Sequence, residues 1–255
     1  MPNPYALQRN WHILPLTIAD QQHHIEQSEM LLSAMAAGDS PTLYWSMAES
    51  QGLVLGFSQQ DTVLNHAALA GLHLPIYHRR AGGTAVLVGP HLLGLDVALP
   101  PDHPLVLPDL VESYRWLGEA WAAALAQFGI QARAIPPVEA HEQRALLKRD
   151  ETRARESILC RSCYGAFSPY EVVVGQRKVV GLDMIRRRTG SLLQAGVLLH
   201  WETETLAQLL GHTPEEQTLL RVELLERAAG LDTLVGRSIA PQEVIAAFQQ
   251  VLDVS

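Results

Sequence analysis

A cysteine and a lysine in the second half of the chain are the residues best suited to nucleophilic chemistry. Cys163 opens residues 163–171, CYGAFSPYE, where glycine and proline indicate a loop, and Lys178 follows between two β-like apolar runs. If the fold brings the two together, the ammonium favours the thiolate and can hold an acyl carbonyl oxygen. From the residues alone, a buried structural cysteine and a solvated lysine stay open as alternatives.

A glycine-containing loop in the first half of the chain is the second candidate. Residues 77–87, YHRRAGGTAVL, place Gly82 and Gly83 directly after a predicted strand. Paired glycines allow positive φ angles and a close approach of backbone N–H groups, which can form an anion nest. Arg79 beside the loop would add charge-assisted hydrogen bonds. A plain turn is the alternative interpretation.

Cys160 and Cys163 form a Cys-x-x-Cys pair, which raises zinc and redox chemistry as further alternatives. Zinc needs about four ligands, and neither a second such pair nor a paired-histidine element lies nearby in the sequence. A redox pair normally opens a helix after a strand, whereas Gly165 and Pro169 follow here. We therefore expect no metal site.

Composition excludes several classes of function. The 255 residues carry a formal net charge of −8, so a nucleic-acid partner is not expected. No segment approaches the roughly 20 apolar residues of a membrane-spanning helix, and residues 1–16 do not resemble a signal peptide. With 47% hydrophobic residues and two cysteines, we expect a packed, cytoplasmic protein without a disulfide framework or a membrane partner.

Hydrophobic periodicity and turn residues predict a chain that mixes helices and strands. Helices are predicted over residues 20–37, 65–72 and 110–128, and strands over 42–47, 52–57, 75–79, 85–88 and 92–99. A short helix and a charged loop are expected within 139–156. Strands follow over 171–174, 178–182 and 192–199, and a helical pattern continues from residue 202. We expect a single sheet flanked by helices, with strands 42–47 and 52–57 joined by a polar turn.

Together, the two chemistry-bearing blocks resemble the superfamily of lipoate-protein ligases, octanoyltransferases and biotin ligases. Its lipoyl branch has Arg-Arg-x-Ser/Thr-Gly-Gly-x-Ala-Val ahead of a later Gly-Arg-Lys-x-x-Gly. Residues 78–86, HRRAGGTAV, match the first pattern with His78 in place of the first arginine. Residues 175–181, GQRKVVG, match the second with one inserted residue, and 192–199, LLQAGVLL, are similar to the family's Leu-Gln-His-Gly-Ser-Ile-Leu.

The resemblance implies an α+β fold, with a central mixed, largely antiparallel sheet flanked by helices, as in the class II synthetase-like catalytic domain of biotin and lipoate protein ligases. Residues 1–255 are then expected to form a single catalytic domain with a helical C-terminal segment, about 202–255, and no separate accessory domain. Cys163 and Lys178 take catalytic positions. The implied substrate-binding residues are His78, Arg79, Arg80, Gly82, Gly83, Thr84, Ser168, Gly181, Asp183, Gln194 and Gly196.

Within this superfamily the chain is most similar to the cysteine-dependent octanoyltransferases. Their Cys-Phe-x-x-Pro-Ser-x-Tyr-Glu run matches residues 163–171 in its cysteine, serine, tyrosine and glutamate. The resemblance implies a thioester on Cys163 and transfer of an octanoyl or lipoyl group to the lysine of a lipoyl carrier domain, with no cofactor. The expected partners are lipoyl domains of the glycine cleavage H protein or 2-oxoacid dehydrogenase E2 type, with acyl carrier protein as a further candidate.

Departures from the family pattern keep rival functions open. Val88 replaces a histidine after the Ala-Val pair, Leu182-Asp183-Met184 replaces Ser-Ala-Gln, and Ala195 replaces the histidine of Gln-His-Gly. The nearest rival is a lipoate or octanoate ligase that uses ATP and Mg²⁺, with Lys178 on the adenylate, and a biotin ligase is a weaker one. A binder of lipoyl domains or acylated carriers without catalysis is the rival from another class.

Three further polar features have less specific interpretations. His23 and His24 lie in a predicted helix and are expected to face solvent. Residues 186–190, RRRTG, indicate a basic hairpin turn that is either simply solvated or steers acidic carriers. Asp96 and Asp183 lie in β-like runs and need a partner if buried, and either could orient Lys178 or an incoming lysine.

Overall fold

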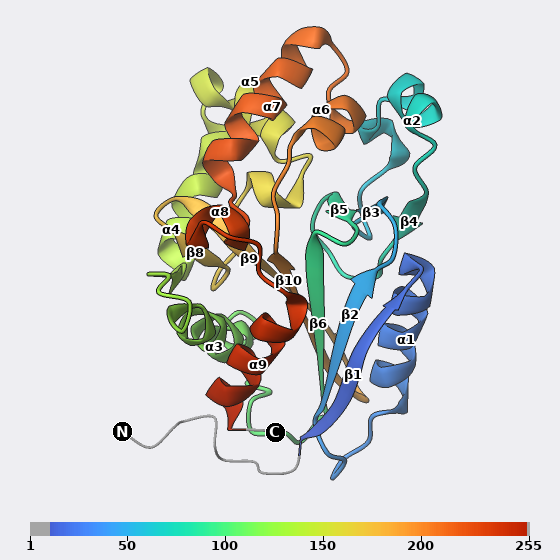
Figure 1. The fold of residues 1–255 in the computed structure, drawn as a ribbon, viewed down its shortest axis with the longest axis vertical. Coiled ribbons are helices and arrows are strands. Elements are labelled where there is room, and N and C mark those ends of the chain that lie inside the picture. Colours follow the sequence, from blue (N-terminus) through green and yellow to red (C-terminus); the bar gives the residue numbers. More distant parts are fainter. Residues whose placement is uncertain (1–10, 254–255) are drawn as a thin grey trace.

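The computed structural model describes residues 11–253, and its main element is a seven-stranded sheet (Figure 1). In spatial order the strands are β1 (His12–Ala19), β2 (Thr42–Ala48), β6 (Leu92–Leu99), β10 (Gly190–Leu198), β9 (Arg177–Arg187), β8 (Val172–Val174) and β7 (Arg133–Ala134). β1 and β2 pair in parallel, and every other neighbouring pair is antiparallel. The predicted fold class is therefore confirmed.

A separate three-stranded sheet carries the glycine-containing loop. Its order is β4 (Ile76–His78), β3 (Gly52–Leu55) and β5 (Val86–Val88), so the loop between β4 and β5 crosses the end of β3. The prediction of a single sheet was wrong, although the strands predicted over 42–47 and 52–57 are present and a short polar segment joins them. β2 pairs with β1 and β6, whereas β3 pairs with β4 and β5. A local apolar pattern predicts a strand but does not encode its partner.

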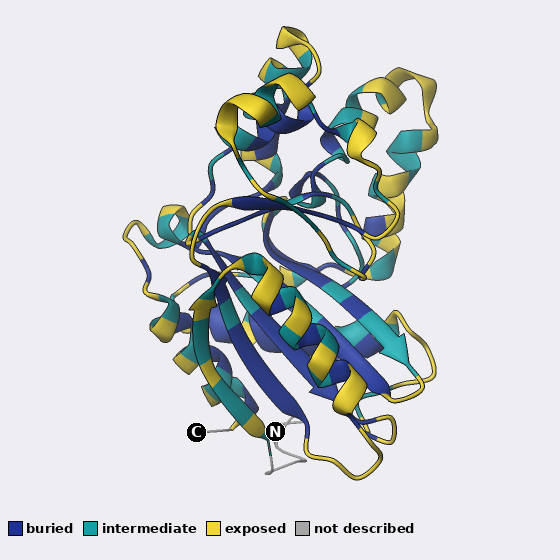
Figure 2. Cartoon of the chain, turned by 90° about the vertical axis from the view of Figure 1, so that its right-hand side faces the viewer, coloured by how far each residue is buried: buried dark blue, intermediate teal, exposed yellow. Residues whose placement is uncertain are grey.

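Helix α1 (Gln21–Ala34) covers one face of the large sheet, with its polar side toward solvent (Figure 2). The helix begins at Asp20, whose carboxylate accepts the N–H of Gln22 at 2.8 Å. Near its C-terminal end, Leu32 packs with Ala98 of β6 and Leu192 of β10. The first turns of α1 face the sheet across a cavity, which is described below.

The opposite face of the large sheet forms the main hydrophobic core. Helices α3 (Arg115–Ala126) and α9 (Pro241–Leu252) pack there, and the helix predicted within 110–128 is confirmed. Trp45 of β2 lies edge-on to Trp121 of α3 and Phe248 of α9, with ring centroids 6.0 and 5.7 Å away. This aromatic cluster fixes the sheet from behind.

The other helices lie mostly beyond the strand ends, around the segment that carries Cys163 (Figure 1). They are α2 (His66–Leu72), α4 (Pro137–Ala145), α5 (Asp150–Leu159), α6 (Glu204–Leu210), α7 (Pro214–Arg227) and α8 (Leu231–Val235), with 3-10 turns η1 (Asp61–Val63), η2 (Glu112–Tyr114), η3 (Leu146–Lys148) and η4 (Cys163–Gly165). Helix α5 replaces most of the charged loop expected before residue 156. Within residues 11–253, no helix has the length and apolarity needed to span a bilayer.

Candidate active site

A cavity of about 160 Å³ lies between the first turns of α1 and the large sheet. Its floor consists of Ser46, Gly94, Gly196 and Gly181, which are directly paired across β2, β6, β10 and β9. Directly paired residues point to the same face, so this row of small residues leaves a trough across four strands. The cavity walls are largely aliphatic, and include the side chains of Ile25, Ala48, Val54, Val86, Val88, Leu92 and Ile185.

Cys163 lines this cavity and lies at the first position of η4. Its backbone N–H donates to the carbonyl oxygen of Ala85 at 2.8 Å, and the N–H of Ala85 donates to Arg161 at 3.1 Å. These two bonds join the cysteine segment to the end of the glycine-containing loop. The two blocks that sequence analysis singled out therefore meet at one site.

Tyr164 also lines the cavity, and sequence analysis gave it no role. Its hydroxyl donates to the carbonyl oxygen of Gly196 at 2.8 Å, and its ring lies under the Lys178 ammonium, 5.5 Å from the nitrogen. The side chain therefore links the cysteine segment to β10 and β9. Its position directly after the cysteine was the only sequence signal available.

Lys178 is 1% exposed, and its ammonium is held by two acceptors. Nζ lies 2.7 Å from a carboxylate oxygen of Glu171 and donates to the carbonyl oxygen of Cys163 at 2.7 Å. Glu171 is also buried, and its carboxylate accepts the backbone N–H of Ser168 at 2.6 Å. Burial raises the pKa of Glu171, although the Lys178 ammonium opposes that shift.

The glycine-containing loop is shaped by its own arginine. The Arg79 guanidinium donates to the carbonyl oxygens of Gly82 and Thr84, at 2.8 and 3.0 Å, and its Nε lies 3.4 Å from the Asp183 carboxylate. Gly83 has a φ of +86°, which favours glycine. Gly56 has no room for a side chain either, because a Cβ there would lie 2.1 Å from the Gly83 carbonyl oxygen.

The predicted site residues divide into two groups. Those that line the cavity are Cys163, Arg79, Arg80, Gly181, Asp183, Gln194 and Gly196. His78, Gly82, Gly83, Thr84, Ser168 and Lys178 lie outside the lining. His78 is exposed near Asp61, at 3.6 Å, and the Ser168 hydroxyl accepts from Arg144 at 3.2 Å. The functional roles of all these residues stay predictions.

One expectation about polar side chains was wrong. His24 is buried and lines the cavity, with its ring nitrogens 2.8 Å from the Tyr44 hydroxyl and 2.9 Å from the Met47 carbonyl oxygen. The helical pattern there was too weak to show which histidine faces inward. The carboxylate that holds Lys178 is Glu171, while Asp96 bonds Ser28 and Gln194, and Asp183 lies against Arg79.

The basic hairpin turn between β9 and β10 is partly engaged within the protein. Arg186 donates to the Leu107 carbonyl oxygen at 2.8 Å, and Arg187 lies 2.9 Å from the Glu29 carboxylate. Arg188 is exposed. Two of the three guanidinium groups therefore already stabilise the fold, which weakens the case for a carrier-steering patch at this turn.

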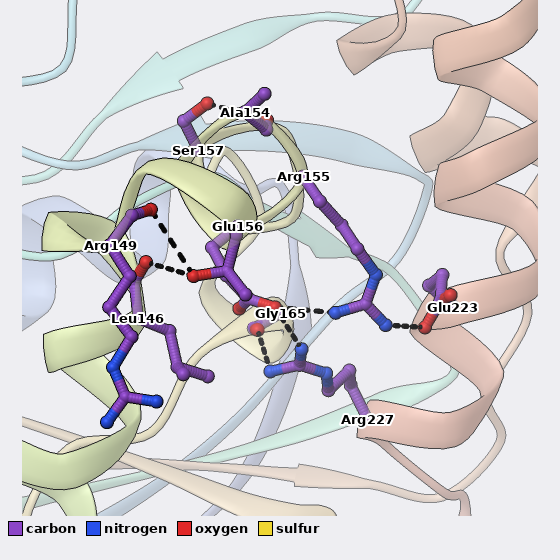
Figure 3. Close-up of polar contacts among 10 residues, drawn as sticks. Leu146, Arg149, Ala154, Arg155, Glu156, Ser157, Gly165, Glu223 and Arg227 are labelled. Carbon is purple, nitrogen blue, oxygen red and sulfur yellow. Dashed lines mark hydrogen bonds and ion pairs between the residues drawn. The ribbon is translucent and has the colours of Figure 1, made fainter.

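The cysteine segment is supported from behind by helix α7 (Figure 3). The buried Glu156 of α5 accepts from Arg227 at 2.7 Å and from Arg155 at 2.6 Å. Arg227 also donates to the carbonyl oxygen of Gly165 at 3.4 Å. Just beyond α7, the N–H of Ala229 donates to the Lys178 carbonyl oxygen at 3.0 Å. The end of one helix therefore contacts both the cysteine segment and the strand that carries Lys178.

Burial shifts the pKa of both cysteine thiols. Burial raises the pKa of Cys163, and the Lys178 ammonium is the strongest opposing influence. Burial also raises the pKa of Cys160, which lies outside the cavity lining at the end of α5. Cys163 alone combines a thiol with access to the cavity, within the part of the chain that the structure describes.

Comparison with known proteins identifies the family. Residues 20–253 match the model of the lipoyl protein ligase A/B catalytic domain. The chain belongs to this family. The resemblance inferred from the two sequence blocks is therefore confirmed.

Two relatives with similar sequences are both named octanoyltransferases, and a solved lipoate protein ligase has the same fold as this lipoyl ligase family member. It is 26% identical to Octanoyltransferase LipM of Exiguobacterium sp., over 94% of this chain and 84% of that protein. It is 29% identical to Octanoyltransferase LipM of Exiguobacterium sibiricum, with the same coverage. A bi-partite lipoate protein ligase of Thermoplasma acidophilum, solved as part of an archaeal lipoylation system, has the same fold, with a TM-score of 0.72 and 18% identity over 97% of this chain and 85% of that one.

Proposed function

We propose that this protein transfers an octanoyl or lipoyl group from a carrier thioester to a lysine of a lipoyl carrier domain. The observation that carries the proposal is the position of Cys163, which lies in the wall of a largely aliphatic trough. Three strand spacings of about 4.8 Å separate the ends of its floor, which is enough for an extended eight-carbon chain. An acyl group bonded to the Cys163 sulfur could extend along this trough.

The reaction divides into two balanced steps. The Cys163 thiolate attacks the donor thioester carbonyl, and the carrier thiol leaves after taking a proton. The amine of the acceptor lysine then attacks the enzyme thioester, loses a proton, and expels the Cys163 thiolate. Covalent catalysis of this kind replaces one difficult acyl transfer with two easier ones.

Lys178 lies outside the cavity lining, so we propose that the acyl carbonyl approaches it beside Cys163. An ammonium has three donors, and two of them are directed at Glu171 and the Cys163 carbonyl oxygen. The third could stabilise the oxyanion that develops on the acyl carbonyl. Because Lys178 bonds the backbone of the nucleophile itself, its charge and the sulfur keep a fixed spacing.

The names of the relatives support transfer over ligation. The matched relatives are called octanoyltransferases, and each aligns with nearly the whole of this chain. On this reading, neither ATP nor Mg²⁺ is needed, and the protein acts in the cytoplasm. We propose lipoyl domains of the H protein or E2 type as acceptors and acyl carrier protein as the donor; the Thermoplasma structure, described with its E2 lipoyl domain, agrees with the acceptor class.

Intact-protein mass spectrometry after incubation with octanoyl-acyl carrier protein, without ATP, tests the proposal. We expect a hydroxylamine-labile octanoyl adduct on the wild type and none on Cys163→Ala. The adduct should form faster as the pH rises above neutral, because burial raises the pKa of the thiol. Cys160→Ala is the matched control, since it removes the neighbouring thiol outside the cavity and should keep the adduct.

Each alternative outcome identifies a rival. An undiminished turnover by Cys163→Ala would overturn the covalent scheme. Lipoate-dependent release of pyrophosphate from ATP would identify a ligase instead. Tight binding of a carrier without turnover, for every donor tried, would identify a non-catalytic binder.

A further inference from the structure

A row of four polar side chains crosses the large sheet beside the small-residue trough. Tyr44, Asp96, Gln194 and Asp183 are directly paired across β2, β6, β10 and β9. They lie two residues along each strand from the trough floor, and so on the same face. Two residues in the other direction along β2 and β6 are Ala48 and Leu92. A chain in the trough therefore has an aliphatic border and a polar border.

Both ends of the polar row are occupied by the protein itself. The His24 ring donates to the Met47 carbonyl oxygen at 2.9 Å, its other nitrogen lies 2.8 Å from the Tyr44 hydroxyl, and burial lowers the pKa of the ring. At the other end, Asp183 lies 3.4 Å from the Arg79 guanidinium. Tyr44 is therefore engaged within the protein, and the charge of Asp183 is compensated by a cation.

The centre of the row is different. Asp96 is 6% exposed and lines the cavity, and its carboxylate has two neutral partners. The Gln194 amide donates to it at 2.8 Å, and the Ser28 hydroxyl shares its single hydrogen between Asp96 and the His24 carbonyl oxygen, which lies 2.7 Å away. Among residues 11–253, no cation lies within ion-pair distance of it. A carboxylate has about four acceptor positions, so two remain unused.

A plain alkyl chain is a poor occupant of this place. Apolar carbons packed against a buried carboxylate leave its unused acceptor positions unsatisfied, which is unfavourable. A ligand hydroxyl or thiol placed there would instead donate to it. Sites built to bond a polar group reject analogues that lack it much more strongly than apolar pockets reject a missing methylene.

We propose that Asp96, Ser28 and Gln194 form a polar subsite of the acyl trough that recognises a hydrogen-bond donor on the acyl chain. The preferred acyl group is then a medium-length chain with a hydroxyl or thiol beyond its carbonyl, rather than octanoyl itself. This inference rests on the proposed acyl-transfer function and specifies the acyl group that it uses.

Acyl carrier protein loaded with octanoyl, or with octanoyl bearing one hydroxyl at successive carbons, provides the test. We expect at least one hydroxyoctanoyl isomer to exceed octanoyl in kcat/KM for Cys163 acylation, by about tenfold or more. Asp96→Leu should reverse that preference by improving octanoyl and impairing the hydroxylated isomer. Asp96→Asn, which keeps the shape and an acceptor oxygen, should retain part of it. Asp102→Leu, an exposed acid outside the cavity, is the control and should change neither rate.

Binding of the free acids separates this inference from the transfer chemistry. Calorimetry of Cys163→Ala with octanoic acid and the hydroxyoctanoic acids reports the subsite even if no thioester ever forms. Tighter binding of a hydroxylated acid, lost in Asp96→Leu, would support the subsite even if the transferase proposal failed. Octanoyl preferred over every hydroxylated isomer, with the ratio unchanged in Asp96→Leu, would overturn it, as would hydroxylated acids that bind no better than octanoic acid.

Discussion

Two buried carboxylates lie near the same cavity and differ in what surrounds them. Glu171 is 2.7 Å from the Lys178 ammonium and also accepts backbone N–H groups, so its charge is compensated within the protein. Among residues 11–253, the partners of Asp96 are a hydroxyl and an amide. The first arrangement holds the nucleophile's backbone in place, whereas the second leaves a charge to be satisfied by whatever enters the cavity.

This difference separates a positioning role from a recognition role. A buried ion pair contributes little net stability, but removal of one partner is costly because the other charge is left alone. A buried carboxylate without an ion-pair partner is unfavourable in its charged form, and burial therefore raises the pKa of Asp96 to about 6. The comparison therefore predicts that removing the charge of Glu171 lowers the free energy of unfolding, whereas removing the charge of Asp96 raises it.

Glu171→Ala should give the largest effect, because it leaves the Lys178 ammonium buried without its partner. We expect the free energy of unfolding to fall by about 3–5 kcal/mol, measured by urea denaturation. Replacing both residues, as Glu171→Leu with Lys178→Met, should recover much of this loss. If the single variant were as stable as the wild type, the compensation between the two charges would be refuted.

Asp96→Asn should stabilise the protein at neutral pH. Burial raises the pKa of Asp96 from 3.8 to about 6, so the folded state binds the proton more tightly than the unfolded state does. The stability contributed by the protonated group is complete below about pH 4 and is lost as the pH rises through about 6. The difference in free energy of unfolding between Asp96→Asn and the wild type should increase by up to about 3 kcal/mol from pH 4 to pH 7.

Comparing wild type and variant at each pH cancels the other titrating groups. The charged and titratable groups around Asp96 lie on every packed element. They are Tyr44 of β2, His24 and Glu29 of α1, Asp183 of β9, Arg79 and Arg80 of the glycine-containing loop, and Cys163 and Tyr164 of the cysteine segment. They are present in both proteins. A stability difference that did not change between pH 4 and pH 7 would contradict the assignment of an uncompensated carboxylate.

Asp183→Asn tests the intermediate case, because this carboxylate is half-buried and lies against Arg79. We expect a change of about 1 kcal/mol or less, because burial raises the pKa of Asp183 while the Arg79 guanidinium opposes that shift, and solvent screens the pair. The loop should keep its shape, because Arg79 still donates to Gly82 and Thr84. The rate at which trypsin cleaves the loop, compared between Asp183→Asn and Arg79→Gln, measures whether the loop keeps its shape. Faster cleavage in Asp183→Asn alone would contradict the expectation.

The smallest effect is expected for an exposed pair far from the cavity lining. Arg133 and Glu139 form a bidentate pair at 2.7 and 2.8 Å, with both side chains substantially exposed. Glu139→Gln should change the free energy of unfolding by less than about 1 kcal/mol, and the difference should disappear in high salt. A larger loss in free energy of unfolding that does not depend on salt would show that burial and partner distances do not predict the order of these effects.

Sequence reasoning found the two blocks because their chemistry is local. Glycines, an arginine, a cysteine and a lysine at fixed spacings were enough to identify the family and to place Cys163 and Gly181 in one cavity. It missed His24, Ser28 and the role of Glu171. Their functions depend on which strand lies beside which, and the pairing of β2 with β6 rather than β3 is not encoded in either strand's own pattern.

The support that α7 gives to the site has a consequence for protein synthesis. The Arg227 side chain and the Ala229 N–H reach back to Gly165 and Lys178, more than 50 positions earlier in the chain. A nascent chain that has emerged from the ribosome only as far as Cys163 and β9 still lacks Arg227 and Ala229, and contacts between distant residues form late in folding. We expect ribosome-bound chains stalled before residue 227 to leave the thiol unorganised, so that premature acylation is avoided until translation has passed α7.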